Sequence, residues 1–109
     1  MKKKLPLKEK IKGYEWTFHA EKSRTYSRKH GSDSHAITYT SEKEVYFNID
    51  TLAPEYIRHE VFHAYISSCS TNSSNLDTFQ MEELCAEVYG DHGPEMDLLV
   101  DKILNHYLK

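Results

Sequence analysis

Residues 57–66 of this 109-residue chain have the sequence IRHEVFHAYI, in which two histidines stand four positions apart and a glutamate follows the first. Apolar residues recur at helical spacing through the stretch, and Pro54 before it suits the first turn of a helix. The residues CSTNSSN at 69–75 are typical of a helix end and a loop. We therefore predict a helix over about residues 54–68.

A small antiparallel sheet is expected before this helix. Residues 35–49 contain two runs of alternating apolar residues joined by a short polar link, which predicts a β-hairpin. Residues 14–18 alternate in the same way and indicate another half-buried strand. The polar residues 21–34, between these segments, predict a long loop.

Two more helices are expected after residue 75. An apolar stripe at helical spacing runs through about residues 77–89, and Gly90 is placed to end that helix. Gly93 and Pro94 then open a third helix over about residues 94–108. Strands followed by helices predict an α+β domain.

Length and composition indicate one soluble domain. The hydrophobic content is 39% and the charged content 28%, which predicts a domain over residues 13–109 after a lysine-rich tail over 1–12. No apolar run reaches the length of a membrane span or of a signal-peptide core, so we expect a cytoplasmic protein without membrane contact. The two cysteines, Cys69 and Cys85, are expected to be free thiols.

The charges are unevenly distributed. Residues 2–12 carry six lysines and one glutamate, whereas residues 59–101 carry nine acidic residues and no lysine or arginine. Such an acidic region keeps a chain in solution and lowers the energy of a bound cation. It argues against nucleic-acid binding, for which the basic residues within 22–29 give only a weak signal.

The two histidines form a candidate metal site. Positions i and i+4 of a helix lie one turn apart on the same face, about 6 Å from one another, so His59 and His63 can bind one ion. Imidazole is a common ligand of zinc. Glu60 is rotated by about 100° from His59, outside the ligand set but within reach of a metal-bound water. Two metal-binding histidines and a glutamate that can act as a base make up the H-E-x-x-H pattern.

A catalytic zinc needs a third protein ligand and an open position for water. Glu83 and Glu87 lie one turn apart on the next predicted helix, so Glu83 can bind the metal while Glu87 holds the free nitrogen of a ligand histidine. The alternatives for the third ligand are Glu82, Glu87, His92, Cys85 and Cys69. In the competing interpretation the two histidines and the two glutamates simply face solvent, because each pair lies opposite the main apolar stripe of its helix.

The two motifs resemble a family of enzymes. HEVFH at residues 59–63 and EELCAE at 82–87 are similar to the gluzincin zinc metallopeptidases, most of all to their shortest forms, the minigluzincins, and to the core of ImmA/IrrE-type metallopeptidases. The resemblance covers about residues 35–90. It implies a zincin-like fold and a peptidase that hydrolyses peptide bonds in a peptide or protein substrate, with one Zn²⁺ per chain.

The resemblance also implies a role for each residue of the motifs. His59, His63 and Glu83 would bind the zinc, and Glu87 would support the first histidine. Zinc lowers the pKa of a bound water toward about 7, and Glu60 would carry the proton of that water to the leaving amine.

Further residues would contact the substrate if the resemblance holds. Residues 44–49 would form the edge strand that pairs with an extended peptide, which places Tyr46, Phe47 and Asn48 beside it. The candidates for stabilising the oxyanion are His92 and Tyr89.

Two other functions compete with this one. A zinc-binding regulatory or peptide-binding module would use the groove without turnover, although the intact Glu60 favours an enzyme. A metal-free adaptor would use the basic residues 2–12 and 22–29, and its binding to nucleic acid would be sensitive to salt. A homo-oligomer, in which a neighbour's chain occupies the cleft, is compatible with the peptidase.

Overall fold

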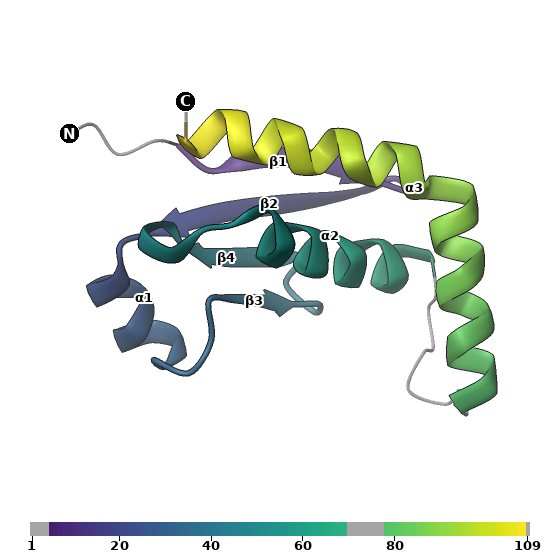
Figure 1. The fold of residues 1–109 in the computed structure, drawn as a ribbon, viewed down its shortest axis with the longest axis horizontal. Coiled ribbons are helices and arrows are strands. Elements are labelled where there is room, and N and C mark those ends of the chain that lie inside the picture. The colour runs from purple at the N-terminus through teal and green to yellow at the C-terminus, as the bar shows by residue number, and fades with distance from the viewer. Residues whose placement is uncertain (1–4, 70–77, 109) are drawn as a thin grey trace.

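The computed structural model describes residues 5–69 and 78–108 and has the expected α+β fold (Figure 1). In chain order its elements are β1 (Leu7–Ile11), β2 (Tyr14–Glu21), α1 (Ser23–His30), β3 (Ala36–Tyr39), β4 (Glu44–Asn48), a 3₁₀ turn (Ile49–Thr51), α2 (Pro54–Cys69) and α3 (Thr78–Leu108). The strands form one sheet in the order β1-β2-β4-β3. The predicted helix that carries the two histidines is confirmed as α2.

The inner face of the sheet carries the hydrophobic core. The register places Phe18 opposite Val45 and Ala20 opposite Phe47, so apolar residues of β2 and β4 line this face together. Helices α2 and α3 cover it, and the fully buried side chains of this layer include Trp16, Phe18, Val45, Phe47, Ile57, Val61, Val100 and Ile103. Burial of one such side chain stabilises the fold by about 1.5–3 kcal/mol, so this layer holds α2 in place.

The sheet is mixed, which corrects the expectation of an antiparallel one. The predicted hairpin is confirmed, since β3 and β4 pair antiparallel. However, β2 and β4 pair in parallel, because β4 lies between β2 and β3. Alternation of apolar residues determines which residues share a face, but it does not determine the order of the strands.

The first strand, β1, lies in residues that the sequence assigns to the lysine-rich tail. Lys12 and Gly13 have φ angles of 52° and 86°, and they form the two-residue turn that joins β1 to β2. Leu7 lies opposite Phe18, and Ile11 is buried. The segment from residue 7 onward is therefore an edge strand in which three charged residues stand between the apolar Leu7 and Ile11.

Helix α1 replaces much of the loop that the sequence predicts over residues 21–34. Its stability comes from residues elsewhere in the chain. Asp50 Oδ2 accepts a hydrogen bond from the Ser23 N–H at 2.8 Å and satisfies the first turn. Tyr26 is fully buried, and Gly31, with a φ of 88°, follows the last helical residue. The prediction was wrong because no pattern within the segment contains the distant partner.

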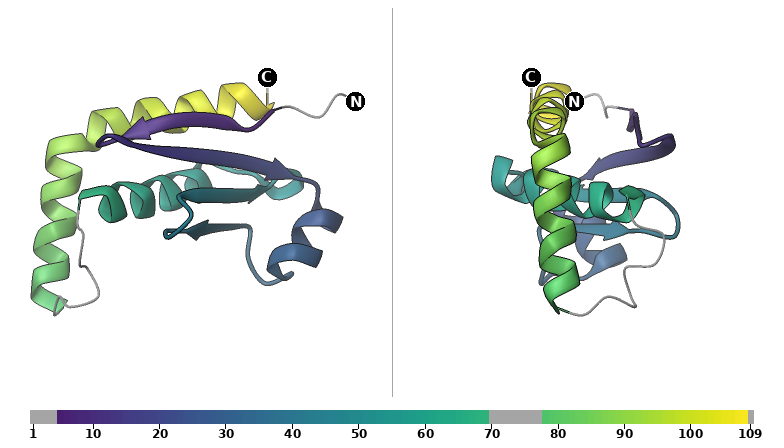
Figure 2. Two further views of the ribbon diagram at one scale, coloured as in Figure 1. Left: turned by 180° about the vertical axis from the view of Figure 1, so that it is seen from behind. Right: turned by 90° about the vertical axis from the view of Figure 1, so that its right-hand side faces the viewer.

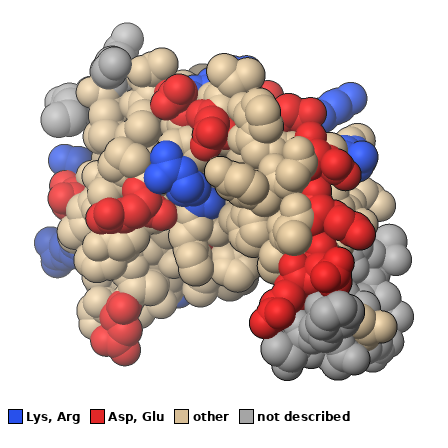
Figure 3. Space-filling view, turned by 45° about the vertical axis from the view of Figure 1, so that its right-hand side comes forward, with Lys and Arg blue, Asp and Glu red and all other residues tan. Residues whose placement is uncertain are grey.

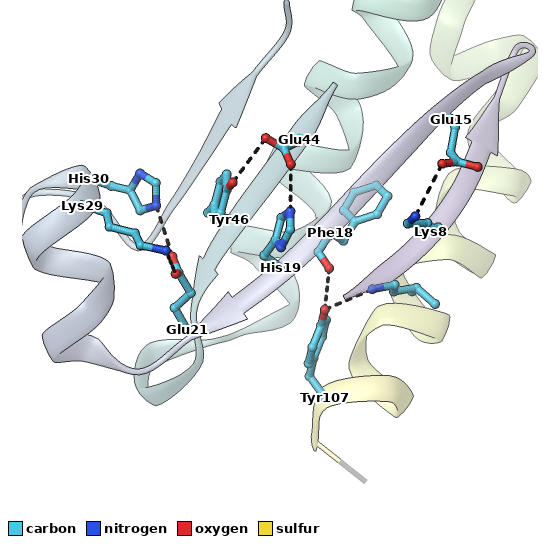
Figure 4. Close-up of polar contacts among 11 residues, drawn as sticks. Lys8, Glu15, Phe18, His19, Glu21, Lys29, His30, Glu44, Tyr46 and Tyr107 are labelled. Atoms are coloured by element: carbon cyan, nitrogen blue, oxygen red, sulfur yellow. Dashed lines mark hydrogen bonds and ion pairs between the residues drawn. The ribbon is translucent and has the colours of Figure 1, made fainter. Parts of the chain in front are cut away.

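A polar network fastens α1 to the outer face of the sheet (Figure 4). His30 Nδ1 lies 2.7 Å from the Tyr39 hydroxyl, and His30 Nε2 lies 3.2 Å from Glu21 Oε1. Lys29 donates a hydrogen bond to Glu21 Oε2 at 2.7 Å. Burial by itself would raise the pKa of Glu21, but the hydrogen bonds and charges of Lys29 and His30 outweigh it, and the pKa is lowered.

Helix α3 is a single helix where the sequence predicts two. Neither Gly90 nor Gly93 has the positive φ of a helix end. Pro94 lies inside the helix, where it lacks a donor and its ring crowds the preceding turn. Figures 1 and 2 show that α3 changes direction sharply, and that its second half runs beside β1. No helix in residues 5–69 and 78–108 is long and apolar enough to cross a membrane.

The end of α3 is tied to the sheet through Tyr107 (Figure 4). Its hydroxyl donates a hydrogen bond to the Phe18 carbonyl and accepts one from the Leu7 N–H at 3.3 Å. This side chain therefore connects the last turn of α3 with β1 and β2.

We expect Tyr107→Phe to lower the free energy of unfolding by about 1–2 kcal/mol, because the buried Phe18 carbonyl loses a donor while the ring still fits. Urea denaturation followed by circular dichroism measures this change. Tyr14→Phe is a matched control at a tyrosine that is 43% exposed, and it should change the free energy by less than about 0.5 kcal/mol. Equal losses in both variants would contradict the role of the Tyr107 hydroxyl.

Glu21→Gln should lower the free energy of unfolding by about 1–3 kcal/mol at pH 7, because the amide carries no charge to pair with Lys29. The folded-state pKa of Glu21 lies below its ordinary value of 4.5. Its contribution is therefore present above pH 4.5 and is lost as the pH falls through the lower folded-state value.

Denaturation of the parent and Glu21→Gln at a series of pH values should thus show a difference that shrinks below pH 4.5. Glu15→Gln, at a carboxylate whose side chain is 57% exposed, is the control and should show little difference at any pH. A difference for Glu21→Gln that grows on acidification would contradict the assigned ion pair.

Candidate metal centre

Helix α2 determines the direction of each side chain in the H-E-x-x-H motif. Its buried residues Ile57 and Val61 face the sheet, and the helical period then turns His59 and His63 outward, where both are exposed. Glu60 is only 7% exposed. The helix therefore presents the two histidines to solvent and the glutamate to the rim of the sheet.

His59 and His63 converge on one point. Their Nε2 atoms lie 3.1 Å apart, and the rings meet edge to face with centroids 4.7 Å apart. Two imidazole nitrogens bound to one tetrahedral zinc, each about 2.0–2.1 Å from the ion, stand about 3.3 Å apart. The pair thus has the spacing that a single zinc ion requires, and a shared proton would suit the same spacing.

The carboxylate of Glu60 lies between the sheet and the histidines. Thr38 in β3 donates a hydrogen bond from its hydroxyl to Glu60 Oε1 at 2.7 Å. Glu60 Oε2 lies 3.8 Å from His59 Nε2. Burial raises the pKa of the Tyr26 phenol in α1, the hydrogen bond with Ser34 opposes this, and the negative charge of Glu60 adds to the increase. One carboxylate oxygen is therefore held by the sheet, and the other is directed toward the histidines.

The predicted third ligand does not lie beside the histidines. Within residues 5–69 and 78–108, no group of three His, Cys, Asp or Glu side chains is arranged to hold a metal ion. Glu83, Glu87 and Glu82 are exposed on the first half of α3. Cys69 and Cys85 are free and partly buried. Burial raises the pKa of the Cys69 thiol, which disfavours the thiolate that a metal would bind.

A groove of about 360 Å³ opens beside the histidines, between α2 and α3. Its lining consists of Glu55, Arg58, His59, Phe62, Tyr89, Met96 and Asp97. Tyr89 is 60% exposed, so its hydroxyl is accessible to a substrate in the groove. The structure therefore brings this oxyanion candidate into the same groove as His59.

The other oxyanion candidate, His92, is placed elsewhere. Its ring packs against that of Tyr65 with a centroid distance of 5.7 Å. His92 Nδ1 is buried without a hydrogen-bond partner, although Glu95 Oε2 lies 3.4 Å away with unfavourable geometry for a hydrogen bond. Burial, followed by the charge and hydrogen bond of Glu95, raises the pKa of Tyr65 to about 12. These contacts give His92 a packing role at the bend of α3.

The expectation that residues 44–49 form an edge strand is wrong, as the order of the strands shows. β4 lies between β2 and β3, so its backbone already has a partner on both sides. Phe47 and Asn48 are buried, and Tyr46 points to the outer face, where its ring stacks on His19 at 4.4 Å (Figure 4). An extended peptide therefore has no free edge of β4 at which to pair with these three residues. Of the two edge strands, β3 makes the more extensive contact with α2.

Thr38 is the site residue that sequence reasoning missed. The register sets it opposite the buried Val45, so it faces α2, whereas Ile37 and Tyr39 face outward. Both faces of this short strand are partly apolar, and the period of two does not show which face is the inner one. The only signal in the sequence is the hairpin register that pairs Thr38 with Val45.

Many acidic side chains are exposed along α3. Figure 3 shows them gathered along one side. Those exposed on α3 are Glu82, Glu83, Glu87, Asp91, Glu95, Asp97 and Asp101. This negative field lowers the energy of a cation bound near α2.

Comparisons with known proteins assign no family to this arrangement of residues. No protein-family model, no curated protein and no solved structure matches the chain. The geometry of α2, β3 and α3 is therefore the basis on which a function can be assigned.

Proposed function

We propose that this chain is a zinc-dependent peptidase of the endopeptidase type, with a zincin-like fold, acting on peptides or proteins in the cytoplasm. The observation that carries the proposal is the convergence of His59 and His63 to 3.1 Å with the buried carboxylate of Glu60 beside them. Burying an ionised carboxylate costs free energy unless hydrogen bonds or a nearby positive charge compensate. A zinc ion bound by the histidines would provide that positive charge, and the carboxylate beside it could act as a general base.

One Zn²⁺ per chain would be held by His59, His63 and Glu83. The spacing of the two ring nitrogens suits the ion, and bound zinc would supply a Lewis acid that polarises the scissile carbonyl and acidifies water. Because no third donor joins the histidines in the described part of the chain, Glu83 has to approach through movement of the first half of α3. Glu87, one turn later, would then hold the second ring nitrogen of a histidine.

The other residues of the site bind substrate and move protons. Glu60 takes the proton of the attacking water on Oε2, since Oε1 is held by Thr38, and passes it to the leaving amine. Tyr89 donates its hydroxyl proton in a hydrogen bond to the oxyanion. An extended peptide pairs with the free edge of β3, so backbone hydrogen bonds supply much of its affinity.

A second candidate is a zinc-binding regulatory or peptide-binding module without turnover. The separation of Glu83 from the histidines among the described residues favours it over the enzyme, because a catalytic zinc needs three protein ligands and an open position. Such a module would still bind a peptide at β3. The two functions differ in whether Glu60 transfers a proton.

The parent protein is expected to contain about one zinc per chain by elemental analysis. His59→Ala and Glu83→Ala should each bind zinc at least about tenfold more weakly, because each loses a ligand. Glu82→Ala, at the adjacent exposed carboxylate, is the matched control and should keep its zinc. Undiminished zinc in Glu83→Ala would move the third ligand to another residue, and no zinc in the parent after zinc is supplied would refute the metal site.

Glu60→Gln should lower peptide turnover by about 10²–10⁴-fold while zinc content is unchanged, because the amide cannot accept the proton of water. Cleavage of a fluorogenic peptide, with zinc analysis of the same sample, measures both quantities. Equal turnover in the parent and Glu60→Gln would exclude Glu60 as the base. A zinc-loaded parent that cleaves no peptide would favour the regulatory module.

A further inference from the structure

Thr38 stands where the free edge of the sheet meets α2. Its hydroxyl donates to Glu60 Oε1 at 2.7 Å, and Glu60 is almost fully buried. A hydrogen bond to an ionised, buried carboxylate is among the stronger ones in proteins. β3, which carries Thr38, is the last strand in the order β1-β2-β4-β3, so among the described strands it has a partner on one side only.

The backbone of Thr38 is directed to that free side. In an antiparallel ladder, opposite residues alternate between pairs that exchange backbone hydrogen bonds and pairs that do not. Asn48 N donates to His35 O at 3.0 Å, and this pair continues the register that sets Ala36 opposite Phe47. The bonded pairs therefore fall at the odd-numbered residues of this strand. Ala36 and Thr38 direct their N–H and C=O groups away from β4.

Thr38 is thus the residue of β3 that can contact both an added strand and Glu60. An added strand would bond to its backbone, while its side chain already holds Glu60. Ala36 has the same backbone orientation but no polar side chain, and Ile37 and Tyr39 face outward. The second oxygen of Glu60 stays directed to His59 at 3.8 Å.

We propose that Thr38 is a positioning residue that couples peptide binding on β3 to the orientation of the base Glu60; this inference rests on the proposed peptidase function. A peptide paired with the backbone of Thr38 restrains its φ and ψ, and the side chain of a β-branched residue then has little rotational freedom. The hydroxyl in turn sets the rotation of the Glu60 carboxylate. The same residue therefore fixes the register of the bound peptide and the oxygen that is free to accept a proton.

Two substitutions separate the hydroxyl from the bulk of the side chain. Thr38→Val keeps the shape and removes the hydroxyl, whereas Thr38→Ser keeps the hydroxyl and removes a methyl group. With the zinc-loaded protein and a peptide that the parent cleaves, we expect Thr38→Val to lower kcat about tenfold with KM within about twofold. Thr38→Ser should stay within about threefold of the parent kcat. Equal losses in both variants, or a loss confined to KM, would overturn the proposal.

A measurement without turnover tests the same contact. In protein labelled with ¹³C-glutamate, the side-chain carboxyl resonance of Glu60 is assigned from its loss in Glu60→Gln. Thr38→Val should shift this resonance at fixed pH, while Thr38→Ser and the exposed control Thr40→Val should leave it near the parent position.

The two measurements distinguish the possible failures. If the parent cleaves no peptide, the proposed peptidase function fails, and the resonance still decides whether Thr38 orients Glu60. A shift in Thr38→Val alone supports that role. An unshifted resonance in Thr38→Val overturns it, whatever the turnover.

Discussion

The packing of α2 against the inner face of the sheet determines where His59, Glu60 and His63 of the candidate site lie. Ile57 and Val61 are fully buried against the sheet, so α2 cannot rotate about its axis without exposing them. At 3.6 residues per turn, this constraint directs His59 and His63 to solvent and turns Glu60 by about 100° toward the rim of the sheet. The close spacing of the two histidines and the burial of Glu60 are thus two consequences of how one helix packs on the sheet.

The burial of Glu60 shows where the structure departs from simple packing rules. Glu60 lies among buried core residues of α2 such as Ile57 and Ala64. The hydroxyl of Thr38 donates a hydrogen bond to its carboxylate. An apolar residue would fill the same space without the cost of desolvation. Departures of this kind are concentrated at functional sites, which makes Glu60 a more informative residue than the exposed histidines.

Local sequence patterns predicted the parts of the fold that depend on nearby residues. The histidine pair and α2 follow from spacing within two turns, and the hairpin of β3 and β4 follows from alternation. The parallel pairing of β2 and β4 does not, because strand order depends on contacts between distant segments. Helix α1 was missed because Asp50 caps it from beyond β4, and the unbroken α3 was missed because Pro94 bends a helix that tertiary contacts hold on one side. The inward direction of Thr38 could be recognised only from the register between β3 and β4.

The bend in α3 separates the part of the helix that carries Glu83 from most of the buried residues of this helix. The buried apolar side chains of α3, among those described, begin at Val88 and continue through Ile103 to Tyr107. Most of these buried residues lie in the second half of α3, Val88 lies in the first half, and Glu83 precedes them all and is exposed. Movement of the first half toward α2 would leave most of the core unchanged, and Pro94 has already removed one backbone hydrogen bond at the bend. If zinc binds as proposed, its binding has to supply the free energy for this movement, and structural zinc in small domains supplies about 10–16 kcal/mol.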